Sequence, residues 1–87
     1  MEMYRPMTKT QTLSELSQGV IARITGFATS DSELEAKLRE VGFAEDDEVE
    51  LLNRGPIGGT PLSIRLNRTV IALRRVEADA IHVASIG

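Results

Sequence analysis

Four short segments of this chain alternate apolar and polar residues, a fifth is β-branched and mostly apolar, and only one segment has the period of an amphipathic helix. The alternating segments are residues 20–27, 48–52, 62–66 and 81–84, and the mostly apolar segment is residues 69–74. Alternation with a period of two places apolar side chains on one face of a strand. Because turn signals separate most of these segments and no strand–helix–strand unit repeats, the pattern predicts a mostly β protein with antiparallel strands. The 87 residues leave room for a single hydrophobic core.

The one helical segment follows the first predicted strand. Leu34, Leu38 and Val41 recur at spacings of four and three residues, which marks one stripe of a helix. Residues 30–33 (SDSE) fit a capping box at its start, and Gly42 ends it. Two pairs of opposite charge, spaced four residues apart, favour the same helix: Glu33 with Lys37, and Glu35 with Arg39.

The segments outside the main pattern are less regular. Residues 1–11 have no hydrophobic period, so we expect a flexible leader there and one folded domain over residues 12–87. Residues 12–15 (TLSE) fit a second capping box, with space for only a turn or two of helix before Gly19. Residues 76–80 are compatible with a single helical turn.

Residues 55–61 (GPIGGTP) interrupt the alternation between two predicted strands. Their glycines permit positive φ and their prolines cannot donate to a strand ladder, so we expect a loop. Asn67 and Arg68 fit a two-residue hairpin turn, because asparagine tolerates positive φ. The chain as a whole predicts a small closed barrel of about five antiparallel strands, with one α-helix inserted between the first two strands.

The composition excludes several classes of protein. The absence of cysteine excludes disulfides, thiolate zinc sites, iron–sulfur clusters and thiol catalysis. The longest apolar run, residues 70–73, is far shorter than a membrane-spanning helix, and the first residues lack a signal-peptide core. We therefore expect a cytoplasmic protein that is not embedded in a membrane.

The residues present no evident catalytic, cofactor or metal site. The single histidine, His82, falls on the outward side of the last predicted strand, without the partners that nucleophilic catalysis needs. Residues 55–59 lack the lysine and the following helix of a phosphate-binding loop. Residues 45–48 (EDDE) lack the ligand spacing of a calcium loop, so a solvated turn is the simpler interpretation. We expect no enzyme activity, no cofactor and no bound metal.

Charge is segregated along the chain although the net charge is only −3. Residues 31–50 hold nine acids and two bases, whereas residues 51–75 hold five arginines and no acid. Two solvated faces that attract each other within one domain would explain this segregation. A polarised surface for a partner is the alternative.

Protein docking is the function that these residues favour. Pro56, Ile57 and Pro61 would present apolar surface with little conformational freedom to lose on binding, and nearby arginines could contact acidic groups. The outward-facing Ile21 and Leu52 would mark an interface if they lie together. A rigid hairpin connection is the structural alternative. The candidate partner-binding residues are Arg54, Pro56, Ile57, Gly58, Gly59, Pro61, Arg65 and Arg74.

Nucleic-acid binding is the main competing function, since small barrels often bind RNA or DNA and five arginines lie close in the sequence. Stacking on bases needs aromatic side chains, however, and we expect both Phe27 and Phe43 in the core. We therefore do not expect a nucleic acid as the partner. Self-association through an exposed strand edge, giving a homo-oligomer, is a further alternative.

Five short motifs give the chain a resemblance to a known family. They are residues 13–16 (LSEL) with Gly19, residues 38–43 (LREVGF), residues 56–59 (PIGG) with 61–62 (PL), residues 71–74 (IALR), and Glu77 and Ala78 with Ile81 and Val83. In this order and spacing, over residues 12–83, the chain resembles the ferrous iron transport protein A (FeoA-like) family. That family usually has Pro-Gly shortly after Gly-Phe, whereas Glu45 and Asp46 stand here, so we expect a wider and more acidic turn.

The resemblance implies an SH3-like barrel, in agreement with the strand count. It also implies a role in ferrous iron transport, because members of the family are small cytosolic proteins encoded beside FeoB, a membrane permease with a GTPase domain. We therefore expect a non-catalytic accessory or regulatory protein that binds the cytosolic part of a FeoB-like permease. The same barrel occurs in metal-dependent repressors, which leaves a self-associating SH3-like domain as an alternative.

Overall fold

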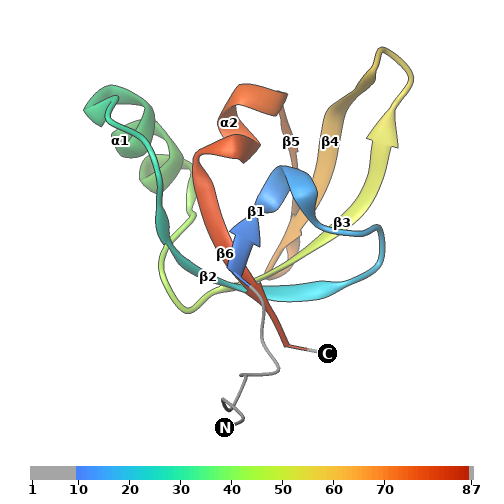
Figure 1. Ribbon diagram of the computed structural model, residues 1–87, viewed down its shortest axis with the longest axis horizontal. Helices are drawn as coiled ribbons and strands as arrows, with labels where there is room; N and C mark the ends of the chain where they lie inside the picture. Colours follow the sequence, from blue (N-terminus) through green and yellow to red (C-terminus); the bar gives the residue numbers. More distant parts are fainter. Residues whose placement is uncertain (1–9, 87) are drawn as a thin grey trace, which may run out of the picture.

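The computed structural model describes residues 10–86 of the chain. Six strands form one antiparallel sheet in the order β1-β6-β2-β3-β4-β5 (Figure 1). The strands are β1 (Thr10–Thr12), β2 (Ile21–Phe27), β3 (Glu48–Gly55), β4 (Gly59–Leu66), β5 (Thr69–Leu73) and β6 (Ile81–Ser85). The helices are the 3₁₀ turn η1 (Leu13–Glu15), α1 (Ser32–Val41) and α2 (Arg75–Asp79).

The structure has one strand more than the sequence predicted. Strand β1 pairs with β6, where Thr10 lies opposite Ala84 and Thr12 lies opposite His82. Its sequence, TQT, has no apolar alternation, so only the pairing with a distant strand defines it. Helix α1 consequently follows the second strand and not the first. Residues 1–9 of the predicted leader lie outside the described residues, and the leader's last two residues belong to β1.

The sheet is curled, but it is not closed into the predicted hydrogen-bonded barrel. Strands β1 and β5 are the two ends of the strand order, and no pairing joins them within residues 10–86. The chain leaves β5 directly into α2, whose first turn closes when the carbonyl of Arg74 accepts hydrogen bonds from the amides of Glu77 and Ala78. This helix turns the chain away from the sheet edge, and it lies with η1 over the open side of the curl (Figure 1).

The predicted loop at residues 55–61 is mostly strand. Gly55 pairs with Gly59 and Arg54 pairs with Leu62, so only residues 56–58 form the turn. The register shifts between these two pairs, which leaves Thr60 and Pro61 as extra residues in β4. Because a bulged residue need not donate to the ladder, Pro61 can stand inside a strand. The predicted two-residue turn at Asn67 and Arg68 is confirmed, with Asn67 at φ 56°.

The hydrophobic core lies inside the curl of the sheet. The predicted alternation is confirmed in β2, β3 and β4, where the buried side chains stand two residues apart: Ala22 and Ile24, Val49 and Leu51, and Leu62, Ile64 and Leu66. Helix α1 contributes chiefly Leu38, because Val41 at its end is 47% exposed. The buried hydrophobic side chains are those of Leu13, Leu16, Ala22, Ile24, Leu38, Phe43, Val49, Leu51, Leu62, Ile64, Leu66, Leu73, Ala78, Ala80, Ile81 and Val83.

Helix α1 begins at a different cap from the one predicted. The carboxylate of Asp31 accepts hydrogen bonds from the amides of Glu33, at 3.0 Å, and Leu34, at 3.2 Å. A single aspartate therefore replaces the capping box predicted from Ser30, and its negative charge also suits the start of a helix. The predicted end of the helix at Gly42 is confirmed, with φ 130°.

The turn that precedes β3 is compact, where a wider turn was predicted. The amide of Asp47 donates to the carbonyl of Ala44 at 3.2 Å, and the amide of Asp46 donates to the carbonyl of Ile24 in β2 at 2.8 Å. Asp46 adopts φ 75°, a left-handed conformation that glycine adopts at lower energy. The backbone thus keeps a tight turn, and Asp46 tolerates a position that suits glycine better.

Candidate partner-binding site

The β3–β4 hairpin projects from the rest of the molecule and carries an apolar tip. Figure 1 shows this hairpin extending past η1 and α2. Ile57 at its tip is 76% exposed, the largest value among the exposed large hydrophobic residues described. The Thr60 amide donates to the Ile57 carbonyl at 3.1 Å, and the Thr60 hydroxyl donates to the same oxygen at 2.9 Å. These bonds fix the turn, so the isoleucine is presented on an ordered backbone.

The composition of the turn follows from its backbone. Gly58 and Gly59 adopt φ 62° and 87°, which other residues reach only with strain. At Gly55, a Cβ atom would overlap the carbonyl of Thr60 across the hairpin, so this position admits no side chain without movement of the backbone. The glycines from which the sequence predicted a loop therefore serve a closely packed turn.

Arg54, next to the turn at the end of β3, ties the hairpin to η1. Its Nη2 atom donates to the carbonyl of Ser14 at 2.8 Å and to that of Leu16 at 3.1 Å. Arg54 lies opposite Leu62 of β4, so its side chain leaves the sheet on the face that carries the core and reaches the end of η1. Arg54 is nevertheless an exposed residue, so it combines a structural contact with a positive charge near solvent.

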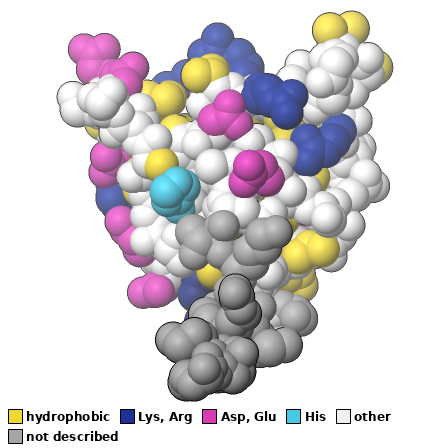
Figure 2. Space-filling view, viewed as in Figure 1, with side chains coloured by type: hydrophobic (Ala, Val, Ile, Leu, Met, Phe, Trp, Pro, Cys, Tyr) yellow, Lys and Arg dark blue, Asp and Glu magenta, His cyan; other side chains and the backbone are white. Residues whose placement is uncertain are grey.

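Arg74 lies on the same side of the molecule, where α2 begins. It follows Leu73, which pairs with Leu62, so β4 alone separates Arg74 from Arg54 across the sheet. Arg75 follows it, and both side chains are exposed. Figure 2 shows Lys and Arg side chains gathered around α2 and toward the hairpin, with hydrophobic side chains at the hairpin's tip.

Beneath this basic cluster lies the one buried acid of the described residues, Glu77. Its carboxylate accepts hydrogen bonds from the Arg74 amide at 2.8 Å and from Nζ of Lys37 in α1 at 3.0 Å. Burial alone would raise the pKa of Glu77, but these bonds and the two positive charges together lower it. Lys37 therefore does not form the predicted pair with Glu33, because the distant Glu77 is its partner.

Arg65 is separated from the other candidate residues. It lies near the opposite end of β4 from the hairpin turn and donates to Oε1 of Glu50 from Nε, at 3.2 Å, and from Nη2, at 3.0 Å. Ile21 is 43% exposed and lies opposite Glu50, beside a shallow hollow that Arg65 also lines. Leu52, two residues after Glu50 on β3, is half-buried, so of these two apolar side chains only that of Ile21 is exposed.

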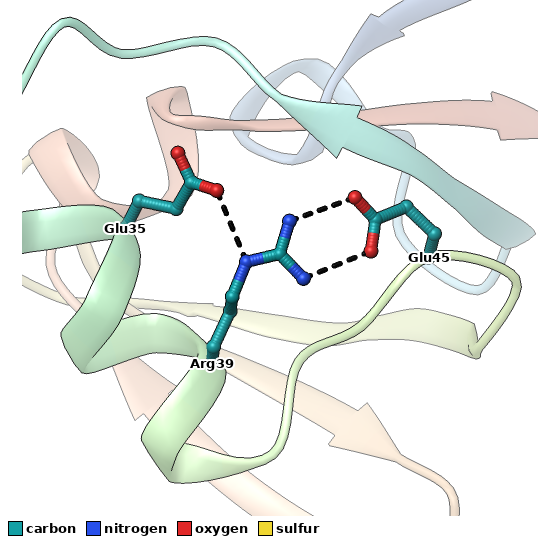
Figure 3. Close-up of polar contacts among 3 residues, drawn as sticks. All are labelled: Glu35, Arg39 and Glu45. Carbon is teal, nitrogen blue, oxygen red and sulfur yellow. Dashed lines mark hydrogen bonds and ion pairs between the residues drawn. The ribbon is translucent and has the colours of Figure 1, made fainter. Parts of the chain in front are cut away.

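One arginine of α1, Arg39, binds two acids of the acidic segment. Arg39 donates to both carboxylate oxygens of Glu45, at 2.9 and 2.8 Å, and to Glu35 at 3.0 Å (Figure 3). The predicted pair of Glu35 with Arg39 is thus confirmed. The guanidinium carbon also lies 4.4 Å from the ring centre of Phe27. The hydrogen bonds from Arg39 lower the pKa of Glu45 to about 2.

The remaining titratable side chains of the described residues do not gather into a metal site. Within residues 10–86, no group of three or more histidine, cysteine or acidic side chains is placed to hold a metal ion. His82 is half-buried in β6, which lies between β1 and β2 and not at an edge of the sheet. Within the same residues, no helix is both long and apolar enough to cross a membrane.

The sequence reasoning missed the link between the two helices, Lys37 with Glu77, and the exposed Arg75 beside Arg74. The three-residue spacing of Arg74 and Glu77 was the available signal, because an acid three residues after a helix cap commonly returns to the cap amide. Nothing local pointed to Lys37, which is forty residues away from Glu77.

The fold is that of a small SH3-like β domain, and solved structures of similar proteins share it. FeoA of Stenotrophomonas maltophilia, crystallised with zinc and described as a prokaryotic SH3 domain protein, is 35% identical, with a TM-score of 0.73 over 84% of this chain and 88% of that one. Iron(II) transport protein A of Clostridium thermocellum is 38% identical, with a TM-score of 0.80 over 88% of this chain and 46% of that one.

A third structure and a family match agree with these two. The FeoA-like protein of Clostridium acetobutylicum is 26% identical, with a TM-score of 0.82 over 93% of this chain and 92% of that one. The FeoA domain family matches residues 11–85. Curated proteins gave no match. The chain therefore belongs to the FeoA family, which is associated with ferrous iron transport.

Proposed function

We propose that this protein is a cytoplasmic, non-catalytic accessory of ferrous iron uptake that docks on the cytosolic, GTPase-containing part of a FeoB-type permease. The docking surface is the β3–β4 hairpin tip, made of Pro56, Ile57, Gly58, Gly59 and Pro61, with Arg54 and Arg74 beside it. The observation that carries the proposal is the exposure of Ile57, 76%, on a turn that is closed by hydrogen bonds.

An exposed isoleucine on an ordered turn suits a protein interface. Burying such a side chain contributes about 1.5–3 kcal/mol, which is typical of a residue that dominates an interface. Because Pro56 and the Thr60 hydrogen bonds already restrict the turn, little conformational entropy is lost on binding. An apolar tip of this kind would enter a pocket on the partner.

The flanking arginines would add charge complementarity. Arg54 and Arg74 are exposed, beside the hairpin turn and at the start of α2 respectively. Charges at the rim of an interface mainly raise the association rate and depend on salt. We therefore expect binding to weaken moderately, but not to vanish, as the ionic strength rises.

Calorimetric titration of the full chain with the cytosolic GTPase region of the permease, with and without GTP, tests this proposal. We expect the substitution Ile57→Asp to weaken binding at least tenfold, which corresponds to about 1.4 kcal/mol. Val41→Asp is the matched control, because Val41 is also an exposed aliphatic residue but lies at the end of α1. Arg54 is not substituted in this test, because its bonds to Ser14 and Leu16 serve the fold.

Four outcomes contradict the proposal. Absence of binding in every nucleotide state would exclude direct contact with that region, and equal loss for Ile57→Asp and Val41→Asp would exclude the hairpin tip as the determinant. A dimer in sedimentation that Ile57→Asp dissolves would assign the tip to self-association. Retention on heparin at moderate salt would favour nucleic-acid binding, the alternative that the arginines keep open.

A further inference from the structure

The strand β5 forms an open edge of the sheet. It is the last strand in the order, and β4 is its only partner within residues 10–86. Leu66 and Thr69 flank the two-residue turn as a hydrogen-bonded pair, so the backbone groups of Val70 and Ala72 point away from β4. No other backbone group within the described residues bonds them. Two N–H and two C=O groups are thus available to a further strand.

The side chains at this edge are uncharged, and they are accessible. Val70 is 60% exposed and Ala72 is exposed beside it, both on the outer face of the sheet. The strand, TVIAL, contains no charge and no proline, the two devices that most often block an edge from within. The edge can therefore accept an extended segment along the length of β5.

Arginines stand at both ends of β5. Arg68 precedes it, and Arg74 and Arg75 follow it. Within the described residues, Arg68 and Arg75 take part in no ion pair, whereas Arg74 lies 3.6 Å from the carboxylate of Glu77. Positive charge therefore brackets the open backbone groups. The acids of residues 31–50 that form ion pairs do so with other arginines: Glu35 and Glu45 with Arg39, Glu48 with Arg23, and Glu50 with Arg65.

The arginines at both ends of β5 disfavour a second copy of the chain as the added strand. The antiparallel register that uses both free residues puts Val70 opposite Ala72 of the second copy. The same register puts Arg68 of each copy opposite Arg74 of the other. Like charges directly opposite each other on neighbouring strands are destabilising. By contrast, an extended segment that carries acids on both sides of a short uncharged stretch would place negative charges opposite these arginines.

We propose that the β5 edge binds an acidic, extended peptide segment of a partner protein by adding it as a strand. The backbone groups of Val70 and Ala72 supply the hydrogen bonds, and Arg68, Arg74 and Arg75 select the charge of the segment. This surface shares Arg74 with the docking surface proposed above but does not include the hairpin tip, so Arg68→Glu tests the β5 edge and Ile57→Asp tests the docking separately.

The test uses a fluorescein-labelled peptide, Glu-Glu-Val-Thr-Val-Glu-Glu, and anisotropy with the full chain at low salt. Two comparison peptides replace the central Val-Thr-Val by Gly-Ser-Gly or the glutamates by lysines. We expect saturable binding of the first peptide only, with the largest amide shifts in NMR spectra at Val70 and Ala72. Arg68→Glu should weaken this binding about fivefold, while Arg23→Glu, on β2, should leave it unchanged.

A second variant removes a backbone donor. Ala72→Pro should abolish binding, because the amide of Ala72 faces away from β4 and its loss spares the β4–β5 ladder. If this variant does not fold, the charge variant and the amide shifts still decide the matter. Equal binding of the Gly-Ser-Gly peptide, shifts centred away from β5, no binding at all, or a β5-dependent dimer in sedimentation would each overturn the proposal.

Discussion

Lys37 and Glu77 join the two α-helices of the protein: Nζ of the lysine lies 3.0 Å from a carboxylate oxygen of the glutamate. The glutamate is buried, and the lysine remains more than half exposed. The same carboxylate also accepts a hydrogen bond from the amide of Arg74 at the start of α2. One side chain therefore both caps a helix and connects it to α1.

We expect Glu77→Ala to lower the free energy of unfolding by about 2 kcal/mol, because it removes the cap of α2 and the partner of Lys37. Lys37→Met should lower it by about 1 kcal/mol, since Glu77 keeps its bond to the Arg74 amide. Urea denaturation measures both. If Lys37→Met proved as costly as Glu77→Ala, the capping bond would contribute little.

Acid should weaken the link between α1 and the turn before β3. The pKa of Glu45 is lowered to about 2 by its bonds to Arg39, below the ordinary value of 4.5. A depressed carboxyl pKa contributes stability that is fully present above about pH 4.5 and is lost as the pH falls toward 2. NMR titration of the Glu45 carboxyl carbon measures this pKa. In Arg39→Leu it should return toward 4.5, and a value that stays near 2 would assign the shift to another cause.

Asp46→Gly should stabilise the protein by about 0.5 kcal/mol. Asp46 adopts φ 75°, where glycine avoids the steric cost of a side chain, although glycine also loses more conformational entropy on folding. Thermal or urea unfolding checks the sign. Asp47→Gly is the control, because Asp47 lies outside the positive-φ region and glycine there should destabilise. Stabilisation of both variants would point to relief of acidic crowding instead.

Gly55→Ala should lower the free energy of unfolding by about 2 kcal/mol, the cost typical of forcing a group into packed space. Its Cβ would overlap the Thr60 carbonyl, whereas nothing lies within 4 Å of a Cβ built at Gly26 in β2. Gly26→Ala is therefore the matched control and should be tolerated. Equal effects on unfolding midpoints would mean that the hairpin adjusts without cost.

The sequence predicted what depends on local pattern. Alternation located the buried faces of β2, β3 and β4, and the asparagine at 67 located a hairpin turn. Strand β1 was missed because three polar residues, TQT, become a strand only by pairing with β6. Closure of the sheet was predicted wrongly, since α2 diverts the chain after β5 and no local feature reveals where the two edges lie.

Of the candidate site, the sequence likewise predicted only the part that depends on local composition. The turn composition pointed to an exposed Ile57, which the structure places at the hairpin tip. The grouping of the arginines required the strand register, which brings Arg54 and Arg74 to one end of β4 and leaves Arg65 near the other with Glu50. The contacts of Arg54 with η1 and of Lys37 with α2 join residues about forty positions apart, which no sequence spacing reveals.

The central claim is that the hairpin tip contacts the permease, and NMR mapping tests it most directly. Unlabelled GTPase region would be added to the ¹⁵N-labelled full chain. The proposal predicts that broadening and shifts concentrate at the amides of Ile57, Gly58 and Gly59 and fade toward α1. Changes centred on α1, or spectra that stay unchanged at saturating partner, would contradict it.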